Sequence, residues 1–214
     1  GREHSCPTRR SSDLARQGDV AGARAAFEAA LKLDAAYAAP AVSLAALDID
    51  KGAYDKAAAR LNDVLARDES NLDALGESGR LAERRGQLAE AQRWLEKAED
   101  HSPTSNLQPG LALVEFHLRN LNPDAAVEAT KRLAGKAPEA IPVLLITARA
   151  RLASGDAVTA KAQLARAAAL ASYNPSYLLQ IALLQMAAGE MSGAAHSLDK
   201  ALDEGATQLS ALAK

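Results

Sequence analysis

Apolar residues along the chain are spaced as on amphipathic helices, in pairs separated by a short break. After residue 53 they recur at intervals of three and four, as on one face of an α-helix: Ala57, Leu61, Val64 and Leu65. An earlier apolar cluster, around Leu44 and Ala45, ends at Lys51-Gly52. Glycine at such a break is typical of the left-handed residue that ends a helix. The pattern predicts two helices joined by a tight turn.

The same two-helix pattern recurs along the chain at a fixed period. Glycines mark the break with intervals of 34, 34, 69 and 34: Gly18, Gly52, Gly86, Gly155 and Gly189. A ladder of alanines has intervals of 34, 34, 35, 34 and 34: Ala23, Ala57, Ala91, Ala126, Ala160 and Ala194. A third ladder has the same intervals: Ala30, Val64, Ala98, Leu133, Ala167 and Ala201. Three ladders in register predict an array of six repeats.

The period sets the boundaries of the predicted repeats. Repeats three and four end at residues that stop a helix, Ser102-Pro103 and Ala137-Pro138. The repeats run over about 4–37, 38–71, 72–105, 107–140, 141–174 and 175–208. Repeat four carries one extra residue and has Leu121 in place of the glycine. We place the extra residue in the turn 101–109. A position at 120–123 stays open, and it would shift the first helix of repeat four by one residue.

Both ends of the chain are expected to lie outside complete repeats. Residues 1–10 read as a disordered or partial segment, residues 11–208 as the array, and residues 209–214 as the start of a further helix. Solenoids usually need polar capping helices, which neither end shows. We therefore expect a segment of a longer array that self-associates through an end. Light scattering that finds a strict monomer at high concentration would contradict this expectation.

Composition supports a helical, water-soluble chain. Alanine, the best helix former, supplies 51 of the 214 residues, and aromatic residues are only 3%. This argues against a β-sandwich or barrel. The net charge of −2 argues against nucleic acid as the main partner, since phosphate binding requires a basic surface. A lone cysteine, Cys6, excludes an internal disulfide and a cysteine zinc cage. Membrane insertion is not expected, because no apolar run reaches about 18 residues.

The repeat resembles the tetratricopeptide repeat (TPR), whose unit places small, bulky and helix-ending residues at fixed offsets. Repeat three supplies Gly79, Gly86, Ala91, Leu95, Ala98 and Pro103. The resemblance covers about residues 10–208. It implies an all-α, right-handed superhelical solenoid of antiparallel helix pairs.

Shorter phrases are similar to bacterial envelope proteins, above all the TPR-repeat lipoprotein of the PEP-CTERM protein-sorting and exopolysaccharide system. They include Trp94-Leu-Glu-Lys-Ala98 and the stretch 111–119 followed by Asn122-Pro123. This resemblance implies a role in envelope protein sorting or exopolysaccharide export and a periplasmic, membrane-anchored full-length protein. A cytoplasmic location stays open because the chain shows no export signal. The anchor is not assigned to Cys6, whose preceding residues are Glu-His-Ser.

No residue pattern points to catalysis, a cofactor or a metal site. The histidines lack metal-binding spacing, and phosphate-loop and nucleophile-elbow motifs are missing. His117 reads as a half-buried packing residue, and Trp94 as a packing residue rather than a ligand platform. An enzyme would have to use Glu83 or Glu115, which form no recognised dyad. An RNA-binding helical repeat would need a basic groove. We therefore expect a protein that is not an enzyme.

The TPR resemblance implies that the first helices line a concave groove. Its middle carries charged residues: Arg80, Glu83, Arg84, Glu115, Arg119 and Arg149. Its C-terminal part is apolar: Leu145, Leu152, Leu179, Leu183 and Met186. Arginine forks suit carboxylates, and a Leu/Met floor suits apolar side chains. We therefore expect the groove to bind a protein or peptide segment with an acidic stretch beside apolar anchors. The alternative is a structural spacer or self-association segment of a longer array.

Overall fold

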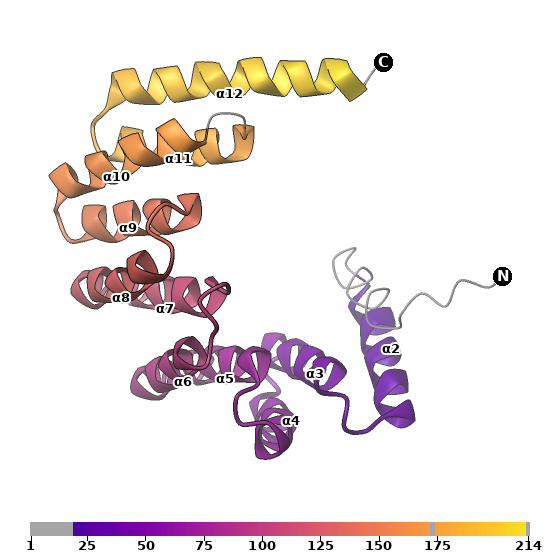
Figure 1. Ribbon diagram of the computed structural model, residues 1–214. Coiled ribbons are helices and arrows are strands. Elements are labelled where there is room, and N and C mark those ends of the chain that lie inside the picture. Colours follow the sequence, from indigo (N-terminus) through magenta and orange to yellow (C-terminus); the bar gives the residue numbers. More distant parts are fainter. Residues whose placement is uncertain (1–18, 172–173, 213–214) are drawn as a thin grey trace. The chain divides into compact units, whose positions relative to one another are not determined.

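The computed structural model describes residues 19–171 and 174–212, with side chains described up to residue 203. Within these ranges the chain forms eleven α-helices joined by short turns, and no strand (Figure 1). The helices belong to two compact units, residues 1–102 and 103–214. The boundary between the units lies in the turn that contains Pro103, and each unit is described by itself below.

From residue 19 onward, the first unit contains one single helix and two helical hairpins. Its helices are α2 (Val20–Leu33), α3 (Ala38–Asp50), α4 (Tyr54–Arg67), α5 (Leu72–Arg84) and α6 (Leu88–Asp100). Helices α3 and α4 form one hairpin and α5 and α6 the next, and α3 also packs along α5. The hairpins therefore stack with their first helices side by side.

The second unit contains three hairpins with the same packing. Its helices are α7 (Gln108–Arg119), α8 (Pro123–Lys136), α9 (Ile141–Ala153), α10 (Ala157–Leu170), α11 (Pro175–Ala187) and α12 (Met191–Leu212). The first helices again pack on one another, α7 on α9 and α9 on α11. Proline in the first turn of α8 and α11 has no cost there, because its missing N–H would have no helical partner.

The turn inside each hairpin requires a left-handed residue, as the sequence predicted. Gly52, Gly86, Gly155 and Gly189 have φ between 74° and 83°; Gly18 lies outside the described residues. Repeat four has Leu121 at the same place, with φ of 55° and its side chain 89% exposed. A leucine there adopts a conformation that L-residues avoid. The fold therefore imposes the turn even where the sequence lacks glycine.

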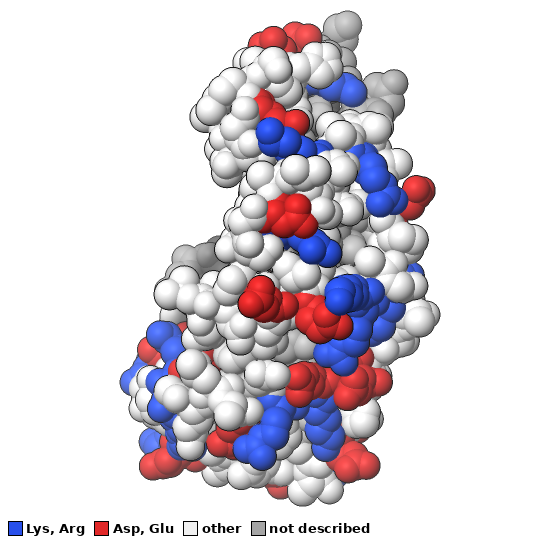
Figure 2. All heavy atoms as spheres, turned by 90° about the vertical axis from the view of Figure 1, so that its left-hand side faces the viewer, with Lys and Arg blue, Asp and Glu red and all other residues white. Residues whose placement is uncertain are grey.

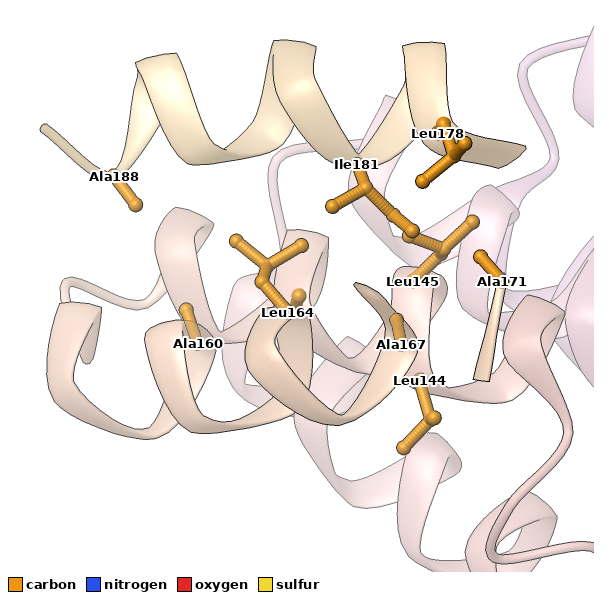
Figure 3. Packing of buried hydrophobic residues seen from close by; sticks show 10 residues of the cluster. Leu144, Leu145, Ala160, Leu164, Ala167, Ala171, Leu178, Ile181 and Ala188 are labelled. Atoms are coloured by element: carbon orange, nitrogen blue, oxygen red, sulfur yellow. The ribbon is translucent and has the colours of Figure 1, made fainter. Parts of the chain in front are cut away.

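The small residues of the ladders lie where helices touch. Five of the six ladder alanines, from Ala23 to Ala160, are 0% exposed, and Ala194 is 2% exposed. Gly79 serves the same close packing, since a Cβ there would lie 2.9 Å from Cγ of Leu95. Figure 3 shows the corresponding core of the second unit, where Leu145 of α9, Leu164 of α10 and Ile181 of α11 point toward one another. Each such side chain contributes about 1.5–3 kcal/mol by leaving water.

Repeat four shows where the extra residue lies. Helix α7 ends at Arg119 and α8 begins at Pro123, on either side of the left-handed Leu121. The turn between α7 and α8 is as long as the hairpin turns that contain Gly52 and Gly155. The extra residue therefore lies in the longer turn before α7, which contains Pro103 and Asn106. The Asn106 side chain accepts a hydrogen bond from the Gln108 N–H at 3.1 Å.

The C-terminus differs from the expectation. A further helix was expected to start at residue 209, but α12 continues without a turn from Met191 to Leu212. Repeats three and four close at Pro103 and Pro138, and repeats two and five are followed by a capping asparagine, Asn71 and Asn174. The segment 203–212 contains neither residue type, and its one glycine, Gly205, does not end the helix. Residues 1–18, with His4, Cys6 and the first helix of repeat one, lie outside the described residues.

A buried carboxylate in the first unit is held by two arginines that sequence analysis did not single out. Asp48 of α3 is 3% exposed. Its Oδ1 accepts from Nη2 of Arg24 on α2 at 2.7 Å, and its Oδ2 accepts from Nε of Arg60 on α4 at 3.0 Å. Two charge-assisted hydrogen bonds offset the cost of removing the carboxylate from water. This cluster joins three consecutive helices.

Candidate groove on the first helices of the second unit

The residues predicted to line the groove lie on first helices, in both units. In the first unit Arg80, Glu83 and Arg84 lie on α5. In the second unit the predicted residues lie on three helices: Glu115 and Arg119 on α7, Leu145, Arg149 and Leu152 on α9, and Leu179, Leu183 and Met186 on α11.

The second unit has a cavity of about 360 Å³ between α7, α9 and α11. Three predicted residues, Glu115, Leu145 and Arg149, line it. The floor is apolar and the rim polar: the remaining lining residues are Gln108, Leu111, Ala112, Pro142, Ile146, Tyr177, Gln180 and Leu184. Figure 3 shows Leu145 at the junction of α9 and α11. The volume lies within the range of about 300–1,000 Å³ that is usual for ligand pockets.

On α11 the cavity is lined by neighbours of the residues that were predicted to line the groove. Sequence analysis placed Leu179 and Leu183 toward the groove, whereas Tyr177, Gln180 and Leu184 line the cavity. The spacing of three and four among these last residues was the available signal. Leu179, Leu183 and Met186 form instead an exposed apolar strip beside the cavity, with exposed fractions of 49%, 58% and 46%. Leu152 is half-buried and packs against the core of the second unit.

The predicted basic character of the groove is neutralised within the chain. Arg149 forms a two-point ion pair with Glu115; its Nη1 donates to Oε1, and its Nη2 donates to Oε2 at 3.2 Å. Both side chains stay partly exposed, at 41% and 33%. The pair connects α9 to α7, one period earlier in the sequence. A partner carboxylate would therefore have to displace Glu115 to bind Arg149.

In the first unit, Arg80 is likewise paired with groups of the chain itself. Its Nη2 donates to the carbonyl oxygen of Ala46 and to Oδ1 of Asp50, both at 3.0 Å on α3. Its Nε lies 3.2 Å from Oε2 of Glu77. Arg84 is farther from Asp50, at 3.9 Å. Figure 2 shows acidic and basic side chains next to one another on the face displayed. The arginines of α5 thus connect neighbouring first helices.

Burial raises the pKa of the Glu77 carboxyl above its ordinary value of 4.5. The nearby Arg80 guanidinium opposes this shift in pKa, and the Asp50 and Asp73 carboxylates reinforce it. Burial disfavours the charged form of a carboxyl because water no longer solvates it. The folded chain therefore holds the Glu77 proton to a higher pH than an exposed glutamate would.

The described residues contain no cluster of three or more metal-ligating side chains, and none of their helices is long and apolar enough to cross a membrane. His101 and His196 are exposed. His117 is 4% exposed, so it is more deeply buried than predicted, and its ring meets Phe116 edge-on with centroids 5.3 Å apart.

Comparison with known proteins gives likenesses in fold. A family model described as the TT21 fifth ARM repeats domain matches residues 38–118. None of the curated proteins compared matches the chain.

Several solved structures are similar along most of their length. Pseudomonas aeruginosa PilF is 19% identical with a TM-score of 0.64, and the match covers 89% of this chain and 86% of that one. PilW, described as a widely conserved type IV pilus biogenesis factor, is 20% identical with a TM-score of 0.64, covering 89% and 88%. YrrB, described as a TPR protein with an unusual peptide-binding site, is 18% identical with a TM-score of 0.52, covering 83% and 91%. By its period, its helical hairpins and these likenesses, the chain has the all-α fold of stacked helical hairpins that is found in tetratricopeptide-repeat structures.

Proposed function

We propose that this chain is a non-catalytic scaffold that binds a peptide segment of another protein. The binding surface is the second-unit groove, which we define as the cavity between α7, α9 and α11 together with the adjacent strip Leu179, Leu183 and Met186. The cavity is the observation that carries the proposal: it has a ligand-sized volume, an apolar floor and a polar rim, on three rigid helices. YrrB, with a peptide-binding site on a similar fold, supports the proposal by analogy.

The partner segment enters the cavity with an apolar side chain and places further apolar residues on the α11 strip. Leu145, at 5% exposure, forms a floor that a side chain of the partner would cover. An acidic residue of the partner next to the apolar anchor would compete with Glu115 for Arg149. The apolar contacts therefore supply most of the affinity, and charge supplies selectivity.

The experiment is a selection of peptides on the full chain, followed by affinity measurements on the best binder by fluorescence anisotropy. Leu183→Glu places a charge on the exposed strip and is expected to weaken binding at least about tenfold, because an apolar contact is replaced by a carboxylate that must be desolvated. Val158→Glu is the matched control, since Val158 on α10 is 82% exposed and lies outside the groove. The proposal would be contradicted if both variants lost the same affinity for the peptide, or if neither variant lost any.

The alternative is a spacer or self-association segment, which the same samples test. A chain that selects no peptide and forms concentration-dependent oligomers in light scattering would support that alternative. Met191 and Leu202 on α12 are 61% and 70% exposed, so Leu202→Glu is the variant that would disperse such oligomers. Peptide binding by a monomer would reject it.

We place the full-length protein in the bacterial envelope, in protein sorting or exopolysaccharide export. The envelope-like phrases in the sequence support this, as does the likeness to PilW, a type IV pilus biogenesis factor. Fractionation of source cells with an antibody against this chain tests the location. Recovery in the periplasmic or membrane fraction is expected, and recovery only in the cytoplasm would contradict it.

A further inference from the structure

The first unit has a second, smaller cavity, of about 110 Å³, between α4, α5 and α6. The lining residues that matter for its chemistry are Ala58 of α4, Ser78 and Ala82 of α5, Arg85 at the end of α5, and Glu90 and Trp94 of α6. Gln87, which also lines it, is exposed, so the cavity opens to solvent. Its volume is below that of a drug-sized pocket and suits the end of one side chain.

The preceding repeat explains why the cavity is empty. Residues one period earlier fill the equivalent space between α2, α3 and α4 with larger or charged side chains: Arg24 corresponds to Ala58, Leu44 to Ser78, Asp48 to Ala82 and Arg60 to Trp94. In that repeat two arginine side chains of the chain itself enter the space and bind the carboxylate of Asp48 at 2.7 and 3.0 Å. Three of the four replacements put a smaller side chain in the later repeat. The space that the arginines occupy in the earlier repeat is therefore left open.

The cavity contains two groups that can bind a guanidinium, an aromatic ring and a carboxylate. The indole of Trp94 lines it, and its Nε1 lies 3.4 Å from Oε1 of Glu90. Among the residues that the structure describes, no lysine or arginine forms an ion pair with Glu90. Arg85 also lines the cavity, but its guanidinium pairs with another carboxylate: its Nη2 donates to Asp55 at 2.7 Å, and its Cζ lies 6.0 Å from the ring centre of Tyr54. A half-buried carboxylate beside an aromatic ring thus has no cation.

We propose that this cavity binds an arginine side chain of a protein partner. The planar guanidinium stacks on the Trp94 indole and pairs with the Glu90 carboxylate, as the chain's own arginines pair with Asp48 one repeat earlier. Arginine fits better than lysine, because its flat, weakly hydrated end group stacks on an aromatic face and presents several N–H donors. The site lies in the first unit and does not depend on the groove proposed for the second.

Trp94 is the only tryptophan in the sequence, so its signals report on this cavity alone. The probe is the peptide acetyl-Ala-Arg-Ala-amide, titrated into the full chain while tryptophan fluorescence and the indole N–H resonance are recorded. The matched peptide with citrulline has the same shape and no charge. We expect a saturable change with the arginine peptide and at least about fivefold weaker binding of the citrulline peptide. No saturable change, or equal binding of both peptides or of a norleucine peptide, would overturn the proposal.

Two variants test the site from the protein side. Glu90→Gln removes the carboxylate charge and is expected to weaken binding of the arginine peptide at least about fivefold. Ala58→Arg restores the arginine of the preceding repeat, so the chain's own guanidinium is expected to occupy the cavity and abolish the response. Glu96→Gln on the same helix is the control, since Glu96 bonds Gln92 at 2.8 Å outside the cavity. Unchanged binding in Ala58→Arg, whose folding circular dichroism verifies, would overturn the proposal even if Glu90→Gln failed to fold.

Discussion

Arg149 on α9 binds both carboxylate oxygens of Glu115 on α7, exactly one period away in the sequence. The pair lies on the wall of the second-unit cavity and joins two stacked first helices. It therefore has two roles: it connects neighbouring repeats, and it keeps the groove electrically neutral until a partner carboxylate competes for the guanidinium.

Replacement of Glu115 by glutamine is expected to make the groove selective for acidic segments. The variant frees the Arg149 guanidinium, so a peptide with a carboxylate beside its apolar anchor should bind about five- to tenfold more tightly, which corresponds to roughly 1–1.4 kcal/mol. Anisotropy titrations with an acidic peptide and its amide counterpart measure the difference. An equal gain for both peptides would show that the carboxylate does not reach Arg149.

Leu121→Gly is expected to stabilise the second unit. Leu121 is held at a positive φ with an exposed side chain, so glycine relieves the backbone without loss of packing. The expected gain is about 1 kcal/mol in the free energy of unfolding, measured by urea denaturation. The reverse swap, Gly155→Leu, is the control: its Cβ would meet nothing within 4 Å, so the expected loss reports on the backbone alone. A destabilised Leu121→Gly would contradict the account of the turn.

Asp48→Asn is expected to destabilise the first unit by about 3 kcal/mol, because it leaves Arg24 and Arg60 without their buried counter-charge. The comparison variant is Asp55→Asn, which breaks the Arg85 ion pair at a fully exposed carboxylate and should leave stability unchanged. Thermal and urea unfolding of both variants provide the test. If the two substitutions changed the free energy of unfolding by similar amounts, burial of Asp48 would not explain the contribution of the cluster to stability.

The contribution of Glu77 to the stability of the first unit is expected to fall as the pH rises above the ordinary pKa of its carboxyl group. Burial raises the pKa of Glu77 in the folded chain, so the folded state holds this proton to higher pH than the unfolded state. The contribution of the protonated form is complete below the ordinary value of 4.5 and is lost as the pH passes the raised pKa. Glu77→Gln removes this dependence. The stability of the variant relative to the original should therefore increase between about pH 4 and 7. A constant difference over that range would contradict the assignment.

The repeat architecture could be predicted from the sequence, because each helix junction needs a particular small residue. Ala57 and its counterparts recur where two helices touch, and Gly52 and its counterparts recur where the backbone turns left-handed. The continuation of α12 past residue 208 could not be predicted from the period. The right length alone does not make a repeat boundary: α12 continues past residue 208, and neither a proline nor a capping asparagine follows Gly205 within it.

The candidate sites could be predicted only in part. The period placed Glu115, Leu145 and Arg149 on the correct wall, but it carried no information about pairing between side chains. The neutralisation of Arg149 and Arg80 depends on the distance between stacked helices, which a ladder of positions does not give. The cavity beside Trp94 shows the same limit. The reason that this cavity exists appears only when residues one period apart are compared at their places in the structure.

The central claim is that a partner segment binds between α7, α9 and α11, and site-specific photocrosslinking tests it most directly. A benzophenone amino acid replaces Tyr177 on the cavity wall in one sample, and Tyr37, at the start of α3 in the first unit, in another. Each full chain is irradiated with the selected peptide, and the products are mapped by mass spectrometry. The account predicts a crosslink from position 177 that excess unlabelled peptide suppresses, and none from position 37. A crosslink from position 37 alone, with position 177 silent, would contradict it.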